Sequence, residues 1–492
     1  MAGNGHYQPV PRTWWVLPFF GGALAVIVVA AAVTVILHTP RMGHQAGVTA
    51  ASSKASPAAR APMPAQMFPD ALYGKLTAAV QGGDEAALLS LAAPGARPAL
   101  RTWWENLQAI GFTTGAVLPT ASHGMVQIDR QGNGSTVVLA GAHSSLDPSD
   151  GNGKPEVPLE RYKIGLHFAS PTATGQITSW QPLGGAPWDE GTKLYVRKTA
   201  HVVVAGLPAE SARVDEVLPL AETAANYDVS LLSHVNFQDL HQQGFIVFVS
   251  GDPTVRDRWL ATTSQPKGWP PGLFGARVFQ LPGPGVSTQA TPPGGISDGT
   301  TGGARVVVAP PGRATGKPHM LTVSLVRDFM LDILAAHDQE FVNGIALAPV
   351  PSWSEQGLAV AVQILFEANT NPAPARYDFG PLTTALHALP ASAKTGTLPG
   401  TAQLFGPPVP AANQNAEEVP QSVYNANEVA ASVYEYIERT YGINQMFAAA
   451  TLLYTRFATP FGNVLKSHSG GTYVFYQAAT VKAGWRAWLA GT

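Results

Sequence analysis

The stretch from Met320 to Val362 constrains the fold more than any other part of the chain. It begins with a run in which apolar residues recur at helical spacing, at Val323, Val326, Phe329 or Met330, and Ile333. A short break follows, and a segment led by Trp353 opens a second run of helical character. We therefore predict two consecutive helices here, the first of which buries one face.

The length and composition set the broad class of the protein. A chain of 492 residues is too long for a single hydrophobic core, so two or three soluble modules are expected. The formal net charge is −2 and only 13% of the residues are charged, which leaves no basic footprint for a nucleic-acid partner. Cysteine is absent, which excludes disulfides, thiolate zinc sites and cysteine nucleophiles.

A membrane segment is predicted near the N-terminus. Residues 14–37 carry no charge and are about as numerous as the ~20 that cross a bilayer as a helix. The alternative is a cleaved signal peptide, but its apolar run would exceed the usual length of about 7–15 residues. We therefore predict a single-pass anchor in the cell membrane, with residues 1–13 as a cytoplasmic tail and the large C-terminal part outside the cytoplasm.

The first soluble module is predicted to be α+β. Residues 38–68 are rich in Ala, Ser and Pro and are typical of a flexible linker. Residues 69–190 then show helical spacing at 72–91, with a break at Gly82 and Gly83, and at 99–110. Alternating runs follow at 124–129, 135–142, 161–169 and 175–182. Helices followed by a curved antiparallel sheet favour an NTF2-like, cone-shaped module.

Two further modules follow. In residues 193–310 the predicted strands 201–206, 244–250, 276–280 and 304–309 alternate with helices at 210–226 and 253–263, which favours a small α/β layer. Residues 312–492 are mostly helical, with further helices predicted at 424–441, 443–457 and 471–489. Gly442 is predicted to end the first of these as a left-handed cap. The predicted fold class of the chain as a whole is thus α+β.

Several of these parts resemble, in their order, a family of actinobacterial membrane or exported proteins with a gluzincin-like (peptidase MA-like) C-terminal domain. The resemblance covers most of the chain. It depends on the anchor, on Trp103-Trp104-x-Asn106-Leu107, on the strand from His201 to Gly206, on the run from Arg305 to Ala335, on Pro351-Ser-Trp353 with Gly357-Leu-Ala359, and on Tyr441-Gly442. Members of this kind read H-E-x-x-H and then W-x-x-E-G-x-A, where two His and a Glu hold zinc.

The present sequence departs from that pattern at its diagnostic positions. The resemblance places Arg327 and Leu331 where the two His belong, Asp328 where the catalytic Glu belongs, and Gln356 at the third ligand. A zinc ligand must offer a lone pair at about 2.0–2.3 Å, and neither Arg327 nor Leu331 has one. Asp328 would have no metal-bound water to activate. We therefore expect no metal, no cofactor and no catalytic residue at these positions.

A shift of the frame by one residue gives an alternative. Asp328 and Asp332 then stand at i and i+4 on one helical face, with Glu355 as a third carboxylate that could help to hold a hard cation. The simpler interpretation is that both aspartates are solvated helix residues and that Glu355 is an exposed residue of the first helical turn. The shift also puts the apolar Phe329 where the catalytic Glu belongs.

Three functions remain open at this point. The first is a non-catalytic, membrane-anchored protein whose degenerate peptidase-like domain binds a peptide or an envelope protein, or serves as scaffold. The cleft for such a partner would lie near Asp328, Asp332, Trp353 and Glu355. The second is an active metal-dependent hydrolase or peptidase that uses the three carboxylates as non-standard ligands. The third is a purely structural protein of the cell envelope.

Overall fold

The computed structural model describes a mixed α+β protein, as the sequence predicts. The described residues all belong to one compact unit, Ala61–Thr492. They are 66–119, 125–144, 146, 160–234, 243–260, 276–282, 301–311, 318–335, 341–342, 345–346, 352–370, 389–400, 403, 421–455 and 478–491. The predicted tail 1–13 and anchor 14–37 lie outside these residues. Among the helices that are described, none is long and apolar enough to cross a membrane.

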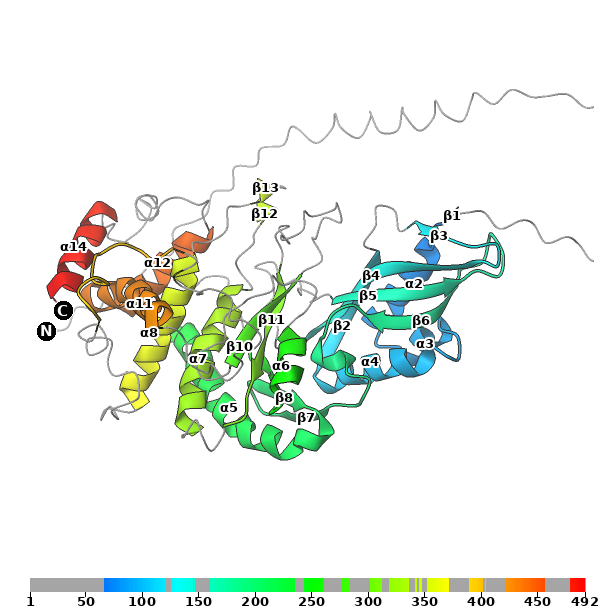
Figure 1. Ribbon diagram of the computed structural model, residues 1–492, viewed down its shortest axis with the longest axis horizontal. Coiled ribbons are helices and arrows are strands. Elements are labelled where there is room, and N and C mark those ends of the chain that lie inside the picture. Colours follow the sequence, from blue (N-terminus) through cyan, green and yellow to red (C-terminus); the bar gives the residue numbers. More distant parts are fainter. Residues whose placement is uncertain are drawn as a thin grey trace, which may run out of the picture. The chain divides into compact units, whose positions relative to one another are not determined.

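The N-terminal region places three helices before an antiparallel sheet (Figure 1). The helices are α2 (Asp70–Gln81), α3 (Glu85–Ser90) and α4 (Arg97–Ala109). The four strands are β2 (Phe112–Pro119), β4 (Asn133–Ser144), β5 (Glu160–His167) and β6 (Gln176–Pro182), in the order β2-β4-β5-β6. The predicted break between α2 and α3 is confirmed, because Gly83 has φ +67° and the Asp84 side chain caps α3.

The predicted C-terminal boundary of the linker, at residue 68, is wrong. Residues 66–68 were expected to be flexible, but β1 (Gln66–Met67) pairs antiparallel with β3 (Val126–Gln127). The Met67 side chain is buried in the aromatic core of the N-terminal region. Backbone pairing together with the burial of one apolar side chain therefore orders this short segment, which lacks the Ala, Ser and Pro residues of the linker before it.

A second sheet follows, with the strand order β10-β11-β9-β8-β7 (Figure 1). Its strands are β7 (Tyr195–Lys198), β8 (Val202–Gly206), β9 (Phe245–Val249), β10 (Ala276–Pro282) and β11 (Thr301–Val308). β8, β9 and β11 are parallel, and β7 and β10 are antiparallel at the two edges. The helix α5 (Ser211–His234) connects β8 to β9, and α6 (Pro253–Leu260) follows β9.

The two faces of this sheet belong to different cores. Alternate residues of the central strands, such as Val204 and Val247, pack with α5 and with the helical C-terminal region. Their neighbours, such as Ala205 and Phe248, pack with Trp259 of α6 and with the aromatic side chains of the N-terminal region. The continuous apolar runs in these strands are explained by burial on both faces.

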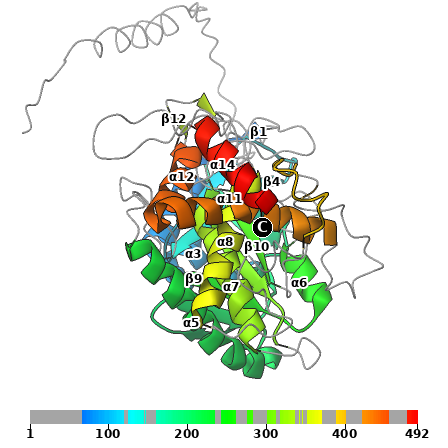
Figure 2. The same ribbon diagram turned by 90° about the vertical axis from the view of Figure 1, so that its left-hand side faces the viewer.

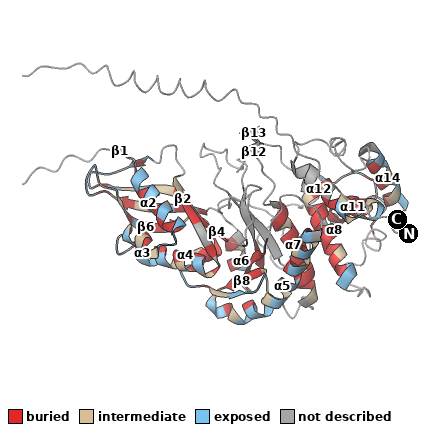
Figure 3. Cartoon of the chain, turned by 180° about the vertical axis from the view of Figure 1, so that it is seen from behind, coloured by how far each residue is buried: buried red, intermediate tan, exposed pale blue. Residues whose placement is uncertain are grey.

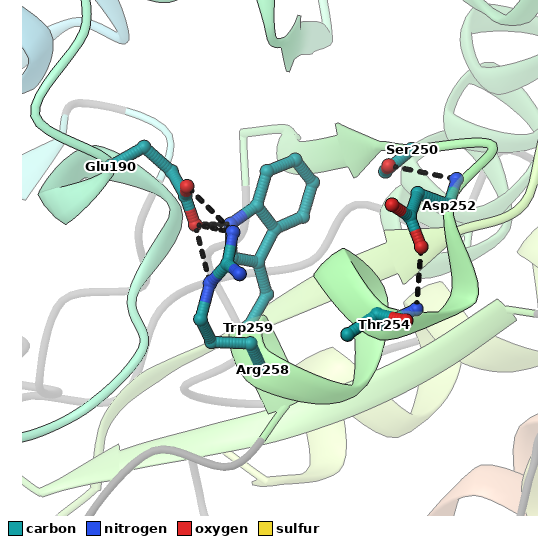
Figure 4. A network of polar contacts seen from close by, with 6 residues as sticks. All are labelled: Glu190, Ser250, Asp252, Thr254, Arg258 and Trp259. Atoms are coloured by element: carbon teal, nitrogen blue, oxygen red, sulfur yellow. Dashed lines mark hydrogen bonds and ion pairs between the residues drawn. The ribbon is translucent and has the colours of Figure 1, made fainter.

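The carboxylate of Glu190, in the segment that follows β6, binds two residues of α6 (Figure 4). Glu190 accepts hydrogen bonds from the Nε and Nη2 atoms of Arg258 at 3.0 and 2.7 Å, and from Nε1 of Trp259 at 2.7 Å. The Glu190 side chain is 13% exposed, and Trp259 is fully buried. At its other end, α6 is capped by Asp252, which accepts from the Thr254 backbone N–H at 2.8 Å.

We expect Glu190→Ala to lower the free energy of unfolding by about 2–3 kcal/mol, because the buried Trp259 N–H loses a charged acceptor. Glu190→Gln keeps one acceptor and should cost about half as much. Urea unfolding followed by tryptophan fluorescence measures both. The control is Glu85→Ala, whose partner Arg101 is half exposed and whose loss should cost less than about 1 kcal/mol. Equal costs at the two positions would contradict this role for Glu190.

The C-terminal region is helical (Figure 2). It comprises α7 (Pro318–Ala335), α8 (Ser352–Thr370), α11 (Gln421–Tyr441), α12 (Ile443–Thr455) and α14 (Ala478–Gly491), with the short strands β12 (Phe341–Val342) and β13 (Ile345–Ala346). Gly442 has φ +88° between α11 and α12, which confirms the predicted left-handed cap. The helix α8 lies between α7 and α11 and contacts both.

Candidate functional site

The two helices predicted between residues 320 and 362 are α7 and α8, and they pack against each other. Figure 3 shows both coloured as buried along most of their length. The helix α7 also packs against α5 and against β10 and β11. A helix with neighbours on several sides must be apolar around most of its circumference, and the sequence of α7 has this character.

Arg327 and Asp328 form a buried ion pair on α7. The Nε and Nη2 atoms of Arg327 donate to Oδ1 of Asp328 at 2.9 and 2.5 Å, and Ser324 Oγ lies 3.5 Å from Oδ2. The side chains of Arg327 and Asp328 are only 5% and 1% exposed. Burial raises the pKa of Asp328 above its ordinary value, while the Arg327 guanidinium acts in the opposite direction.

The predicted solvation of the two aspartates is wrong. Asp328 is 1% exposed and Asp332 is 3% exposed, because the face of α7 that carries them is covered by neighbouring elements. Leu331, at the second predicted His position, is partly buried and packs against the main apolar core. Phe329 is fully buried and stacks on Phe245 of β9, with ring centroids 4.0 Å apart.

The N-terminal end of α8 contributes the remaining predicted residues. Trp353 and Gln356 are each 8% exposed. Glu355 lies in the first turn of α8 as predicted, but it is half-buried rather than exposed. Ser354 forms a hydrogen bond with the phenol of Tyr434 on α11, and the Tyr434 ring lies 6.2 Å from that of Trp353.

Gly357 permits the close approach of α8 to α11. A Cβ atom at this position would lie 2.7 Å from the backbone oxygen of Ala430, which is closer than such atoms pack. The glycine predicted to follow the third-ligand position therefore has a packing role here. His319 lies within the first turn of α7 and stacks on Phe366 of α8, with ring centroids 6.5 Å apart.

The arrangement offers no set of metal ligands in the part of the chain that the structure describes. No group of three or more His, Asp or Glu side chains there is placed so that it could hold a metal ion. Asp328, Asp332 and Glu355 all belong to that part, so the frame-shifted set is not gathered into a metal site. Asp328 is held instead by a guanidinium, which has no lone pair to share with a metal.

The sequence alone predicts no site role for two further groups: the Tyr and Trp residues near the C-terminus are expected to pack a helical core, and His234 and His241 to be surface or satisfied residues. Tyr434 and Trp485 are buried in the helical core as predicted, and Trp485 Nε1 donates to Ser432 Oγ at 2.9 Å. His241, Tyr473 and Tyr476 lie outside the described residues.

The comparisons with known proteins add no assignment: no model of a protein family matches this chain, and no curated protein is significantly similar to it.

Proposed function

We propose that this protein is a non-catalytic binding or scaffolding protein, anchored in the cell membrane by residues 14–37. In this proposal the C-terminal helical region is a degenerate gluzincin-like metallopeptidase domain, and residues 69–190 form an NTF2-like module. The large C-terminal part lies outside the cytoplasm, and the partner is a peptide or a protein of the cell envelope.

The observation that supports a non-catalytic role most directly is the buried pair of Arg327 and Asp328. At these two positions a zinc peptidase of the resembled kind has its first His ligand and its catalytic Glu. Here the guanidinium is bonded to the carboxylate, and both side chains are shielded from solvent. A buried ion pair of this kind satisfies both charges inside the fold and leaves Asp328 poorly placed to activate a water molecule.

The proposal is tested by the metal content of the full-length protein purified in detergent. We expect much less than one zinc per chain in the unaltered protein after dialysis against zinc and then against buffer. The variant with Arg327→His, Asp328→Glu, Leu331→His and Gln356→Glu should instead retain about one zinc per chain, because it supplies three ligands with the required spacing. The control carries the same changes except Leu331→His and should lose its zinc.

The outcomes separate two parts of the proposal. One zinc per chain in the unaltered protein, lost in Asp328→Ala, would contradict a non-catalytic role. Failure of the four-residue variant to hold zinc, despite an unchanged circular dichroism spectrum, would contradict the resemblance to a gluzincin frame. Cleavage of a peptide library by the unaltered protein, abolished in Asp328→Ala, would support the hydrolase alternative.

A further inference from the structure

A pocket lies between the C-terminal half of α8 and the end of α11, apart from the buried ion pair on α7. Together with the open solvent at its mouth, it contains about 420 Å³ of empty space. The lining from α8 and α12 is uncharged and consists of Ala361, Ile364, Leu365, Ala368 and Met446. The lining from α11 is polar and consists of Glu435, Glu438 and Arg439.

Glu435 is the most buried polar group of this lining. Its side chain is 9% exposed, and its Oε1 atom accepts from Nη2 of Arg439 at 2.6 Å. The Oε2 atom is buried and meets no hydrogen-bond donor in the part of the chain that the structure describes. A buried carboxylate oxygen without a donor is costly, so a donor that enters the pocket would be bound favourably. The terminal torsion of glutamate is broad and roughly two-fold, so a half-turn of the carboxyl group exchanges the positions of its two oxygens.

The charges of the lining favour a cation over an anion. Two carboxyl groups, Glu435 and Glu438, face one guanidinium, Arg439, and α8 and α12 add no charge. The pKa of Glu435 is raised to about 7, mainly by burial, while Arg439 acts to lower it and Glu438 to raise it. Arg439 can balance the charge of only one of the two carboxylates, so a second cation beside Glu435 would balance the other.

We propose that this pocket binds a primary ammonium group carried on a short aliphatic chain, with the ammonium on Glu435 and the chain against α8 and Met446. A water-sized group occupies roughly 30 Å³, so four or five heavy atoms need on the order of 150 Å³, which is less than the space in the pocket and at its mouth. The side chain of lysine and small alkylamines share this chemistry. This site does not depend on the metal chemistry of α7.

The probe is n-butylammonium chloride, titrated into the full-length protein and followed by ligand-observed NMR. Five heavy atoms can give only weak binding, and we expect a dissociation constant in the millimolar range at pH 8. The affinity should fall about 30-fold at pH 5.5, since the ionised fraction of a group that titrates near pH 7 falls to a few per cent. N-acetyl-lysine amide tests whether the source is a protein lysine: its binding supports that source, and binding of butylammonium alone supports a free amine.

The variant Glu435→Gln keeps the shape of the side chain and should weaken butylammonium binding at least tenfold at pH 8. Glu438→Gln makes the same charge change in the same lining without removing the buried carboxylate and should weaken it less than threefold. Thermal unfolding of each variant checks that the fold is kept. Binding of n-butanol or butyrate as strong as that of butylammonium would overturn the proposal, and so would unchanged binding in Glu435→Gln.

Discussion

Replacing Arg327 with methionine is expected to lower the free energy of unfolding by about 3–5 kcal/mol. The change keeps an unbranched side chain of similar length but leaves the Asp328 carboxylate in the interior without its guanidinium. The side chains of both partners are no more than 5% exposed, so water cannot replace the lost interaction. Urea unfolding of the full-length protein at pH 7, followed by near-ultraviolet circular dichroism, measures the loss.

The double variant Arg327→Met with Asp328→Leu distinguishes a lost pair from a lost side chain. It removes both charges, and we expect it to be as stable as the unaltered protein or up to about 4 kcal/mol more stable. Arg101→Met is the matched control at an exposed pair, where Arg101 and Glu85 are 51% and 42% exposed, and its cost should stay below about 1 kcal/mol. A cost below about 1 kcal/mol for Arg327→Met would show that the pair is not held in a dry interior.

The local signals in the sequence predict the main elements of the fold. Apolar periodicity and glycine breaks are local properties, and they locate α2, α3, α4, α7 and α8 with their order. The continuous apolar runs around Val204 and Val247 likewise predict the buried strands β8 and β9. Strands with no such run were missed, and β1, β2 and β7 owe their form to the neighbour with which each pairs.

The candidate site was harder to predict because burial is decided by distant parts of the chain. The i, i+4 spacing of Asp328 and Asp332 correctly places them on one face, but spacing alone cannot show that this face is covered. One signal was present in the sequence: α7 has apolar residues around most of its circumference, which is typical of a helix buried on several sides. The contact between Ser354 and Tyr434 joins residues 80 positions apart and has no local signature.

The two polar features of the helical region differ in what they can bind. The carboxylate of Asp328 is satisfied by Arg327 within α7, so its charge is balanced inside the fold. The carboxyl of Glu435 borders a pocket, and one of its oxygens has no donor among the described residues. A binding role for the pocket beside Glu435 is therefore compatible with the absence of catalysis proposed for α7, and different measurements test the two proposals.

Asp228 carries the last prediction, because it is a fully buried carboxyl on α5. Neither of its oxygens meets a hydrogen-bond donor in the part of the chain that is described. Burial raises the pKa of Asp228 well above its ordinary value, and no charged neighbour opposes this. The carboxyl therefore takes up a proton when the protein folds at any pH between the unfolded and the folded pKa.

We expect Asp228→Asn to remove a pH-dependent loss of stability. Because the pKa of Asp228 is higher in the folded than in the unfolded protein, its carboxyl contributes to the free energy of unfolding. This contribution is fully present below about pH 4 and is lost as the pH rises toward the folded pKa, at about 1.4 kcal/mol per pH unit. Asparagine has a similar volume and no charge, so the variant should match the unaltered protein near pH 4 and exceed it increasingly toward pH 7. The difference between the two unfolding free energies is measured at each pH, since Asp189 and Glu435 also have raised pKa values and contribute slopes of the same sign to both proteins.

Asp129→Asn is the control of opposite sign. Hydrogen bonds from Asn133 lower the pKa of the exposed Asp129, so that variant should lose stability above the unfolded pKa rather than gain it. A stability difference between Asp228→Asn and the unaltered protein that stays constant from pH 4 to pH 7 would mean that Asp228 is ionised in the folded state and has found a partner there.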